Sequence, residues 1–229
     1  MRAYLYGDAN AAEFASLLLR VGNGHIPVVE GRDTIFIPEH LGTVTDSPQT
    51  LIEQVYPNLQ HHYQDFEWLM QRAILAPHNL SIRDINWEML HQFPGEIKIY
   101  KSIDTVRDDD AVHYPSGFLD SLEPAGMPPH RLALKVGIPL MVLRNLALGI
   151  GNGTRLILKR MMNNCLEATI ATGPHKGQDV YQPKIPLIPS DTGLPFEFKR
   201  LQFPVKVCFA MTINKAQGQT LAVAGLDLH

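Results

Sequence analysis

Residues 72–90, RAILAPHNLSIRDINWEML, constrain the fold of this chain more than any other stretch. They begin with an apolar run, Arg72–Ala76, which predicts a buried strand. Residues 77–79 follow as a tight turn, and Ser81 has the chemistry of a helix N-cap. The next apolar residues are spaced to share one helix face: Ile82, Ile85, Met89 and Leu90. Strand, turn and helix in this order form the unit of a parallel sheet, so we predict an α/β domain.

The residues upstream carry further helix signals. Asn10, followed by Glu13, predicts a capping box for a helix that Gly22 ends. Ser47 and the proline after it predict the start of another helix, closed near residue 57. A short strand is expected at residues 34–37.

The pattern changes near residue 95, where short β-type runs replace helical periodicity. These runs fall at residues 96–100, 132–136, 140–143, 154–158 and 168–171. Residues 184–204 read as a proline-containing connector, and residues 205–213 and 221–228 as returning strands. We therefore predict an α/β domain in two parts, residues 1–100 and 185–229, interrupted by a β-rich insertion at residues 101–184.

Charge is distributed unevenly along the chain. The net charge of −3 argues weakly against nucleic acid as a partner. Residues 131–176, however, hold seven basic residues and one acidic residue, a local excess of +6. Such a block is typical of a phosphate-contacting surface, although a solvated sheet face with lysines along its edges has the same pattern.

Other features bound the class of protein. No apolar run reaches the roughly 20 residues that span a bilayer, and the N-terminus lacks the apolar core of a signal peptide. Two widely separated cysteines, Cys165 and Cys208, suit a reducing compartment. These features predict a soluble intracellular protein. None of the ten histidines belongs to a recognisable metal-binding motif, so we expect no metal site.

Residues 209–221, FAMTINKAQGQTL, form the most specific segment. An apolar strand delivers Thr212, Asn214, Lys215 and Gln217 onto a turn at its carboxyl end, where ligands gather in open parallel sheets. Short hydroxyl and amide groups, a lysine charge and the close backbone approach that Gly218 allows all suit a phosphate. A strand followed by a polar turn without any ligand fits the same pattern.

The sequence AMTINKAQGQTL resembles a motif of superfamily-one DNA helicases of the RecD and Pif types, and most closely its version in Helitron transposons. The resemblance implies an α/β fold, a RecA-like second motor domain, in which this segment joins single-stranded DNA to the nucleotide cleft. Thr212, Asn214 and Lys215 are then implied to contact the DNA backbone. Gln217 and Gly218 are implied to couple that contact to ATP.

Three other segments carry the same resemblance. Residues 128–146 and 151–156 resemble the family's inserted 2B subdomain, a small SH3-like β element. Residues 73–79, with Ile85 and Asn86, resemble the strand, turn and helix that open the RecA-like sheet, and imply a DNA contact by Asn79. The basic residues implied to contact DNA from the insertion are Lys135, Arg144 and Arg155.

The phosphate-binding loop G-x-x-x-x-G-K-[ST] occurs nowhere in the sequence. The resemblance implies ATP and Mg²⁺ for the complete family protein, with Arg2 reaching the γ-phosphate across the cleft. A surface arginine leading a helix is the alternative for Arg2. For this chain alone we expect neither tight nucleotide binding nor ATP hydrolysis.

By resemblance, the chain is the C-terminal portion of an ATP-dependent 5′–3′ DNA helicase. Its implied partners are single-stranded DNA and an N-terminal RecA-like domain; its implied setting is the nucleus, in DNA repair, recombination and telomere maintenance. Two alternatives stay open: a non-catalytic, transposon-derived module that binds nucleic acid, and a scaffold that docks proteins on the β insertion. Tyr114 and Phe118 are candidates for base stacking, with core packing favoured for Phe118.

Overall fold

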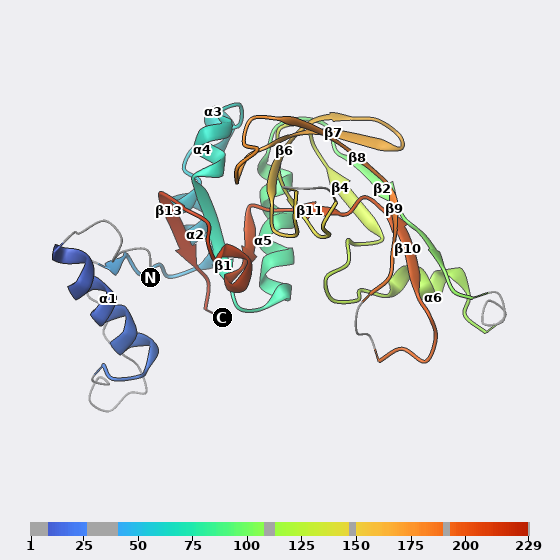
Figure 1. Ribbon diagram of the computed structural model, residues 1–229. Helices are drawn as coiled ribbons and strands as arrows, with labels where there is room; N and C mark the ends of the chain where they lie inside the picture. Colours follow the sequence, from blue (N-terminus) through green and yellow to red (C-terminus); the bar gives the residue numbers. More distant parts are fainter. Residues whose placement is uncertain (1–8, 27–40, 108–112, 147–149, 190–192, 229) are drawn as a thin grey trace. The chain divides into compact units, whose positions relative to one another are not determined.

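A computed structural model describes residues 9–26, 41–107, 113–146, 150–189 and 193–228 (Figure 1). The chain divides into two units, Met1–Thr45 and Asp46–His229. The main described element of the first unit is α1 (Ala9–Gly22), which exposes Phe14 and Leu19. This helix already contains Asn10, so the cap predicted there is wrong, whereas its end at Gly22 is confirmed. Arg2 and the strand expected at residues 34–37 lie outside the described residues.

The second unit contains a parallel sheet of three strands, in the order β12 (Ala210–Thr212), β1 (Arg72–Ala76) and β13 (Val223–Leu226). Central β1 pairs Ile74 with Ala210 on one side and with Gly225 on the other (Figure 1). Ile74 is fully buried, as expected for a strand covered on both faces. The predicted strand at residues 72–76 and the return of the last strands to its sheet are confirmed.

Four helices of this α/β part flank β1 in the sequence: α2 (Pro48–Val55), α3 (Leu59–His62), α4 (Phe66–Met70) and α5 (Asn79–Gln92). The predicted cap of α2 is confirmed, because Ser47 Oγ accepts a hydrogen bond of 3.1 Å from the Thr50 amide. α5 begins at Asn79, two residues before the cap predicted at Ser81. Its predicted apolar face is confirmed, since Ile82, Ile85, Met89 and Leu90 are all buried. No described helix has both the length and the apolar character needed to cross a membrane.

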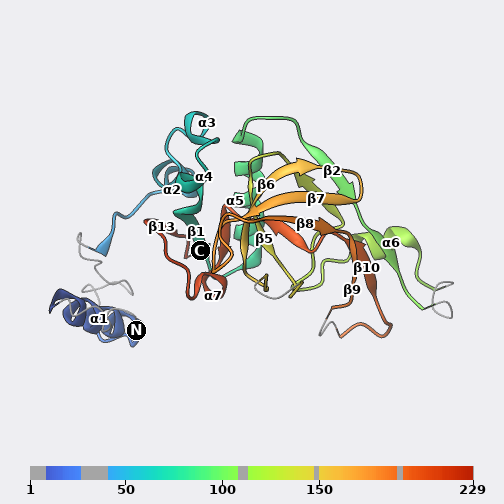
Figure 2. The ribbon, with the colours of Figure 1, turned by 45° about the horizontal axis from the view of Figure 1, so that its top comes forward.

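An antiparallel sheet of five strands forms most of the β insertion. Its order is β11 (Val205–Val207), β5 (Pro139–Val142), β6 (Arg155–Met161), β7 (Cys165–Ile170) and β8 (Asp179–Pro183). Figure 2 shows β6, β7 and β8 running side by side. The inward side chains of Leu140, Leu156, Leu158 and Leu166 join the main hydrophobic core.

The remaining strands form two smaller sheets. β2 (Lys98–Lys101) pairs with β4 (Arg131–Leu134), and β10 (Lys199–Gln202) lies between β3 (Ile103–Thr105) and β9 (Ile185–Leu187), near α6 (Ser116–Ser121). The interpretation of residues 184–204 as a plain connector is therefore wrong. The alternating burial predicted around residues 132–136 is also wrong: residues 132–135 are all buried, whereas Val136 is exposed.

Residues 205–213, predicted as one strand, serve two sheets. β11 pairs with β5 in the antiparallel sheet, and β12 pairs with β1 in the parallel sheet. Cys208 and Phe209 join them, and both side chains are fully buried. The Tyr56 hydroxyl donates to the Phe209 carbonyl over 2.9 Å, which satisfies a backbone group at the change of sheet. The predicted fold class, an α/β domain with an inserted β element, is confirmed; the predicted domain boundaries stay a prediction.

Candidate nucleic-acid interface

The carboxyl ends of β1 and β12 lie at one edge of the parallel sheet, because Ala76 is directly opposite Thr212. β1 leads through residues 77–78 into α5, whose first residue is Asn79. β12 leads into α7 (Ile213–Ala216), which holds Asn214 and Lys215. Asn79 and Asn214 are exposed, and Thr212 and Lys215 are half-buried. The fold thus brings the two predicted contact segments to one edge, although Asn79 and Thr212 are 133 positions apart in the sequence.

The first turn of α5 adds an electrostatic feature to this edge. His78, its N-cap residue, is extended and forms no side-chain capping bond. The first amide groups of an α-helix have no partner inside the helix, and its N-terminus carries about half a positive charge. Because α5 is 14 residues long, this end favours an anion such as a phosphate.

Asn86 holds this edge in place from inside the protein. Its Oδ1 accepts hydrogen bonds from the Phe209 and Ala210 amides at 2.8 and 2.9 Å, and its Nδ2 donates to the Ala210 carbonyl at 2.9 Å. The side chain therefore ties α5 to the start of β12. Resemblance had marked Asn86 only as part of a segment, and its role as a buried positioning residue was not predicted.

Lys215 connects the edge to the β insertion. Its ammonium donates to Asn152 Oδ1 over 2.6 Å, and nearby Gln219 Nε2 donates to the Gly153 carbonyl over 3.4 Å. The predicted coupling residues are both exposed: Gln217 follows α7, and Gly218 has a φ of +82°, a conformation that favours glycine. Asn152 was missed, because its sequence signal was only that of a glycine-rich turn.

The basic block at residues 131–176 does not form a free cationic face. Three of its seven cations pair with carboxylates: Lys159 with Asp179, Arg160 with Glu167, and Lys176 with Glu67. Three others donate to backbone carbonyls: Lys135, Arg144 and Arg155. Only Arg131 makes no side-chain bond to the described residues. The local excess of +6 therefore overstates the charge that this region offers to a ligand.

Two of the predicted DNA contacts lie inside the protein instead. Lys135 is buried and donates to the Phe93 carbonyl at the end of α5, and burial lowers the pKa of Lys135. Arg155 is fully buried and donates to the carbonyls of Met70 and Arg72 over 2.8 and 3.0 Å. Both side chains fasten the β insertion to the α/β part and are already bonded to backbone carbonyls. Arg144 stays accessible while donating to the Ile188 carbonyl over 3.0 Å.

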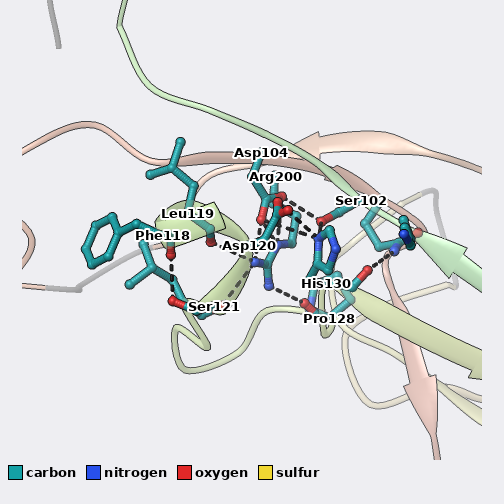
Figure 3. Close-up of polar contacts among 12 residues, drawn as sticks. Ser102, Asp104, Phe118, Leu119, Asp120, Ser121, Pro128, His130 and Arg200 are labelled. Carbon is teal, nitrogen blue, oxygen red and sulfur yellow. Dashed lines mark hydrogen bonds and ion pairs between the residues drawn. The ribbon is translucent and has the colours of Figure 1, made fainter. Parts of the chain in front are cut away.

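A second polar cluster, drawn in Figure 3, is structural in character. Arg200 and Asp104 form a fully buried pair in which Arg200 Nε lies 2.9 Å from Asp104 Oδ1. Arg200 also donates to the Pro128 and Leu122 carbonyls over 3.0 Å. Arg200 is therefore an internal structural residue, although its neighbour Lys199 is exposed. Asp104, Asp120 and His130 have a metal-compatible spacing, but the guanidinium already occupies both Asp104 oxygens.

The predicted stacking candidates sit on this structural side of the insertion. Tyr114 contacts Phe196 at a ring-centroid distance of 4.0 Å, and Phe118 stacks on Tyr114 at 6.0 Å. Phe118 is 44% exposed, so the expectation of full core packing is not met.

Comparison with known proteins identifies the insertion. Residues 117–161 match the family model of the DNA helicase Pif1 2B domain. Among curated proteins, none matches the chain by sequence.

Solved Pif1 structures share the fold. Bacteroides Pif1 bound to single-stranded DNA has 18% identity and a TM-score of 0.50, over 81% of this chain and 44% of that one. A structure of two coordinating Pif1 helicases at forked double-stranded DNA has 20% identity and a TM-score of 0.50, over 81% and 42%. Candida albicans Pif1 has 19% identity and a TM-score of 0.49, over 78% and 47%.

This chain spans less than half the length of each of these solved structures. At identities of 18–20% the solved structures show a shared fold only. The family model matches residues of the β insertion. Together they confirm the resemblance inferred from the motifs: the chain is similar to Pif1 helicases in fold, and residues 117–161 match the Pif1 2B domain model.

Proposed function

We propose that this chain grips single-stranded DNA and forms one wall of the ATP cleft in a Pif1-type, ATP-dependent 5′–3′ DNA helicase. One observation carries the proposal: Ala76 lies opposite Thr212, which brings the uncapped start of α5 and the turn with Lys215 to the same sheet edge. Ligands gather at this edge in open parallel sheets.

The grip proposed here is smaller than the one the sequence implied. It comprises Asn79, Thr212, Asn214 and Lys215, together with the accessible Arg144 of the insertion, and leaves out the buried Lys135 and Arg155. Gln217 and Gly218 come directly after α7 and are exposed. We propose that they couple DNA binding to the ATP site. Contacts of this type are made to the phosphate backbone of DNA. We therefore expect binding with little sequence preference and a strong salt dependence.

The chain alone is proposed not to hydrolyse ATP. Its sequence has no phosphate-binding loop, and a partner RecA-like domain, with Mg²⁺, supplies that chemistry in the complete helicase. The alternative of a non-catalytic nucleic-acid-binding module makes the same prediction for the isolated chain. The two differ in whether a phosphate-binding domain restores turnover when added or fused.

Fluorescence anisotropy of a labelled single-stranded oligonucleotide tests the grip, with ATP turnover recorded in parallel. We expect binding that weakens with salt and falls by about tenfold in Lys215→Ala, because one charged contact contributes about 1.5 kcal/mol. Lys199→Ala is the matched control, since Lys199 is exposed on β10, away from the edge. Equal losses in both variants, or no binding by the folded chain, would refute the grip.

A further inference from the structure

A cavity of about 520 Å³ lies between α5 and the segment that connects α6 to β4. Most of its lining is apolar and includes Ile82 of α5, Met127 of the connecting segment and Leu132 of β4. Its volume is within the range of about 300–1,000 Å³ that is usual for small-ligand sites. None of the predicted functions accounts for this space.

One cation of the cavity lining, Arg131, has a second cation as its cross-strand neighbour. Arg131 lines the cavity and lies directly opposite Lys101 in the β2–β4 register, so the two side chains share one face. Both are exposed, and neither side chain bonds to any described residue. Like charges directly opposite each other destabilise a sheet, and a bound anion between them would remove that cost.

Trp87 provides a flat surface at the same cavity. It belongs to α5, lines the cavity and is 54% exposed. Its only ring contact among the described residues is an edge contact with His91, at a centroid distance of 4.4 Å. An exposed indole is the usual partner of an unstacked base, and such stacking contributes about 1–3 kcal/mol per base.

Three of the other charged residues in the lining pair with one another, whereas the side chain of Lys206 on β11 bonds to no described residue, and burial lowers its pKa. Arg83 lies 3.1 Å from Glu123 and 3.7 Å from Asp84, so these two carboxylates are engaged by one guanidinium. The Arg83–Glu123 pair is exposed and joins α5 to the connecting segment, and a pair of this type contributes little to stability. It is thus no obstacle to a ligand entering between the two walls.

We propose that this cavity takes one nucleotide of a bound single strand, with its base against Trp87 and its phosphate between Lys101 and Arg131. The inference rests on the proposed DNA grip. Asn79 belongs both to the grip and to the cavity lining, and Trp87 follows it by eight residues, about 12 Å along the helix. A single DNA strand bound at the sheet edge can therefore follow α5 from Asn79 to Trp87 and place one base in the cavity.

The first test compares a labelled oligo-dT with the same strand made abasic, which keeps every phosphate and removes the bases. We expect the abasic strand to bind about tenfold more weakly, and Trp87→Ala to lose the preference for bases while Trp87→Phe keeps most of it. Tyr181→Ala is the control, because Tyr181 is a more exposed aromatic residue on β8 that does not line the cavity. Arg131→Gln should weaken both strands, whereas Lys199→Gln should not.

A second readout is the fluorescence of Trp87 itself. The chain has two tryptophans, so Trp68→Phe leaves Trp87 as the sole indole emitter. We expect oligo-dT to quench this emission and the abasic strand to leave it unchanged. Quenching by free dTMP at concentrations where the oligonucleotide has no effect would overturn the proposal in favour of a mononucleotide site.

The outcomes separate the cavity from the grip. If oligo-dT and abasic strands bind equally and Trp87 is not quenched, while Lys215→Ala still weakens binding, the base site is wrong and the grip stands. If the folded chain binds neither strand, both are wrong.

Discussion

The ammonium of Lys215 donates a hydrogen bond to Asn152 Oδ1 over 2.6 Å, from the turn after β12 to the turn between β5 and β6. The two residues are 63 positions apart, one in the α/β part and one in the β insertion. The residue proposed to bind DNA therefore already has a neutral partner, which a phosphate has to replace.

We expect Asn152→Ala to leave DNA affinity unchanged or to raise it a few-fold, because it frees Lys215 for phosphate. In a double-mutant cycle with Lys215→Ala, urea unfolding should give a coupling of about 0.5–1.5 kcal/mol. A loss of DNA affinity in Asn152→Ala as large as that in Lys215→Ala would instead make Asn152 a direct DNA contact.

Breaking the buried pair of Arg200 and Asp104 should be costly. Arg200→Met leaves the Asp104 carboxylate buried without its cation, and we expect a loss of about 3–5 kcal/mol in the free energy of unfolding. The double variant Arg200→Met/Asp104→Leu should recover much of it, because no unpaired charge remains. Arg107→Met is the matched control, since Arg107 pairs with Glu197 at the surface and should cost under about 1 kcal/mol. Similar losses for Arg107→Met and Arg200→Met would contradict this account.

Asn86 should matter for stability more than any exposed polar residue of α5. Asn86→Ala removes the partners of two amides and a carbonyl at the start of β12, with an expected loss of at least about 2 kcal/mol in urea unfolding. Asn79→Ala, on the same helix but exposed, should change stability by less than about 0.5 kcal/mol. In variants that stay folded, Asn79→Ala should weaken DNA binding more than Asn86→Ala does. A stronger binding defect in folded Asn86→Ala would argue against a DNA contact by Asn79.

The two thiols should differ in reactivity. Cys208 is fully buried, and burial raises the pKa of its thiol, whereas Cys165 is half-buried. A thiolate-specific reagent at mildly alkaline pH should therefore modify one thiol quickly in the native protein and both after unfolding. Cys165→Ser should abolish the fast phase; a fast phase that survives this change would mean that the segment between β11 and β12 opens readily.

The sequence predicted helices and strands correctly where a short local pattern of residues is enough to identify them. The apolar run at residues 72–76 formed the central strand, and Ser47 capped α2, because the signal for each element lies in neighbouring residues. Long-range partners could not be predicted in this way. Arg155 finds its carbonyl acceptor at Met70, 85 positions away, and no periodicity reveals that pairing.

The candidate site shows the same limit. The order of chemical groups after residue 209 indicated a ligand-binding turn, and the fold brings it beside Asn79. A count of charges, however, does not show which cations already have partners. The basic residues expected to contact DNA from the insertion therefore included Lys135 and Arg155, which are buried, and no sequence pattern indicated Trp87 beside the cavity.

The change of sheet between β11 and β12 has a mechanical consequence. The Cys208 amide donates to the Pro139 carbonyl in the antiparallel sheet, and the Phe209 carbonyl accepts from the Ile74 amide in the parallel sheet. Two adjacent residues are thus anchored on opposite sides of the boundary, with no slack between them. We therefore expect a displacement of the turn that follows β12 to be passed directly to the β insertion, so that the two sheets move as one body.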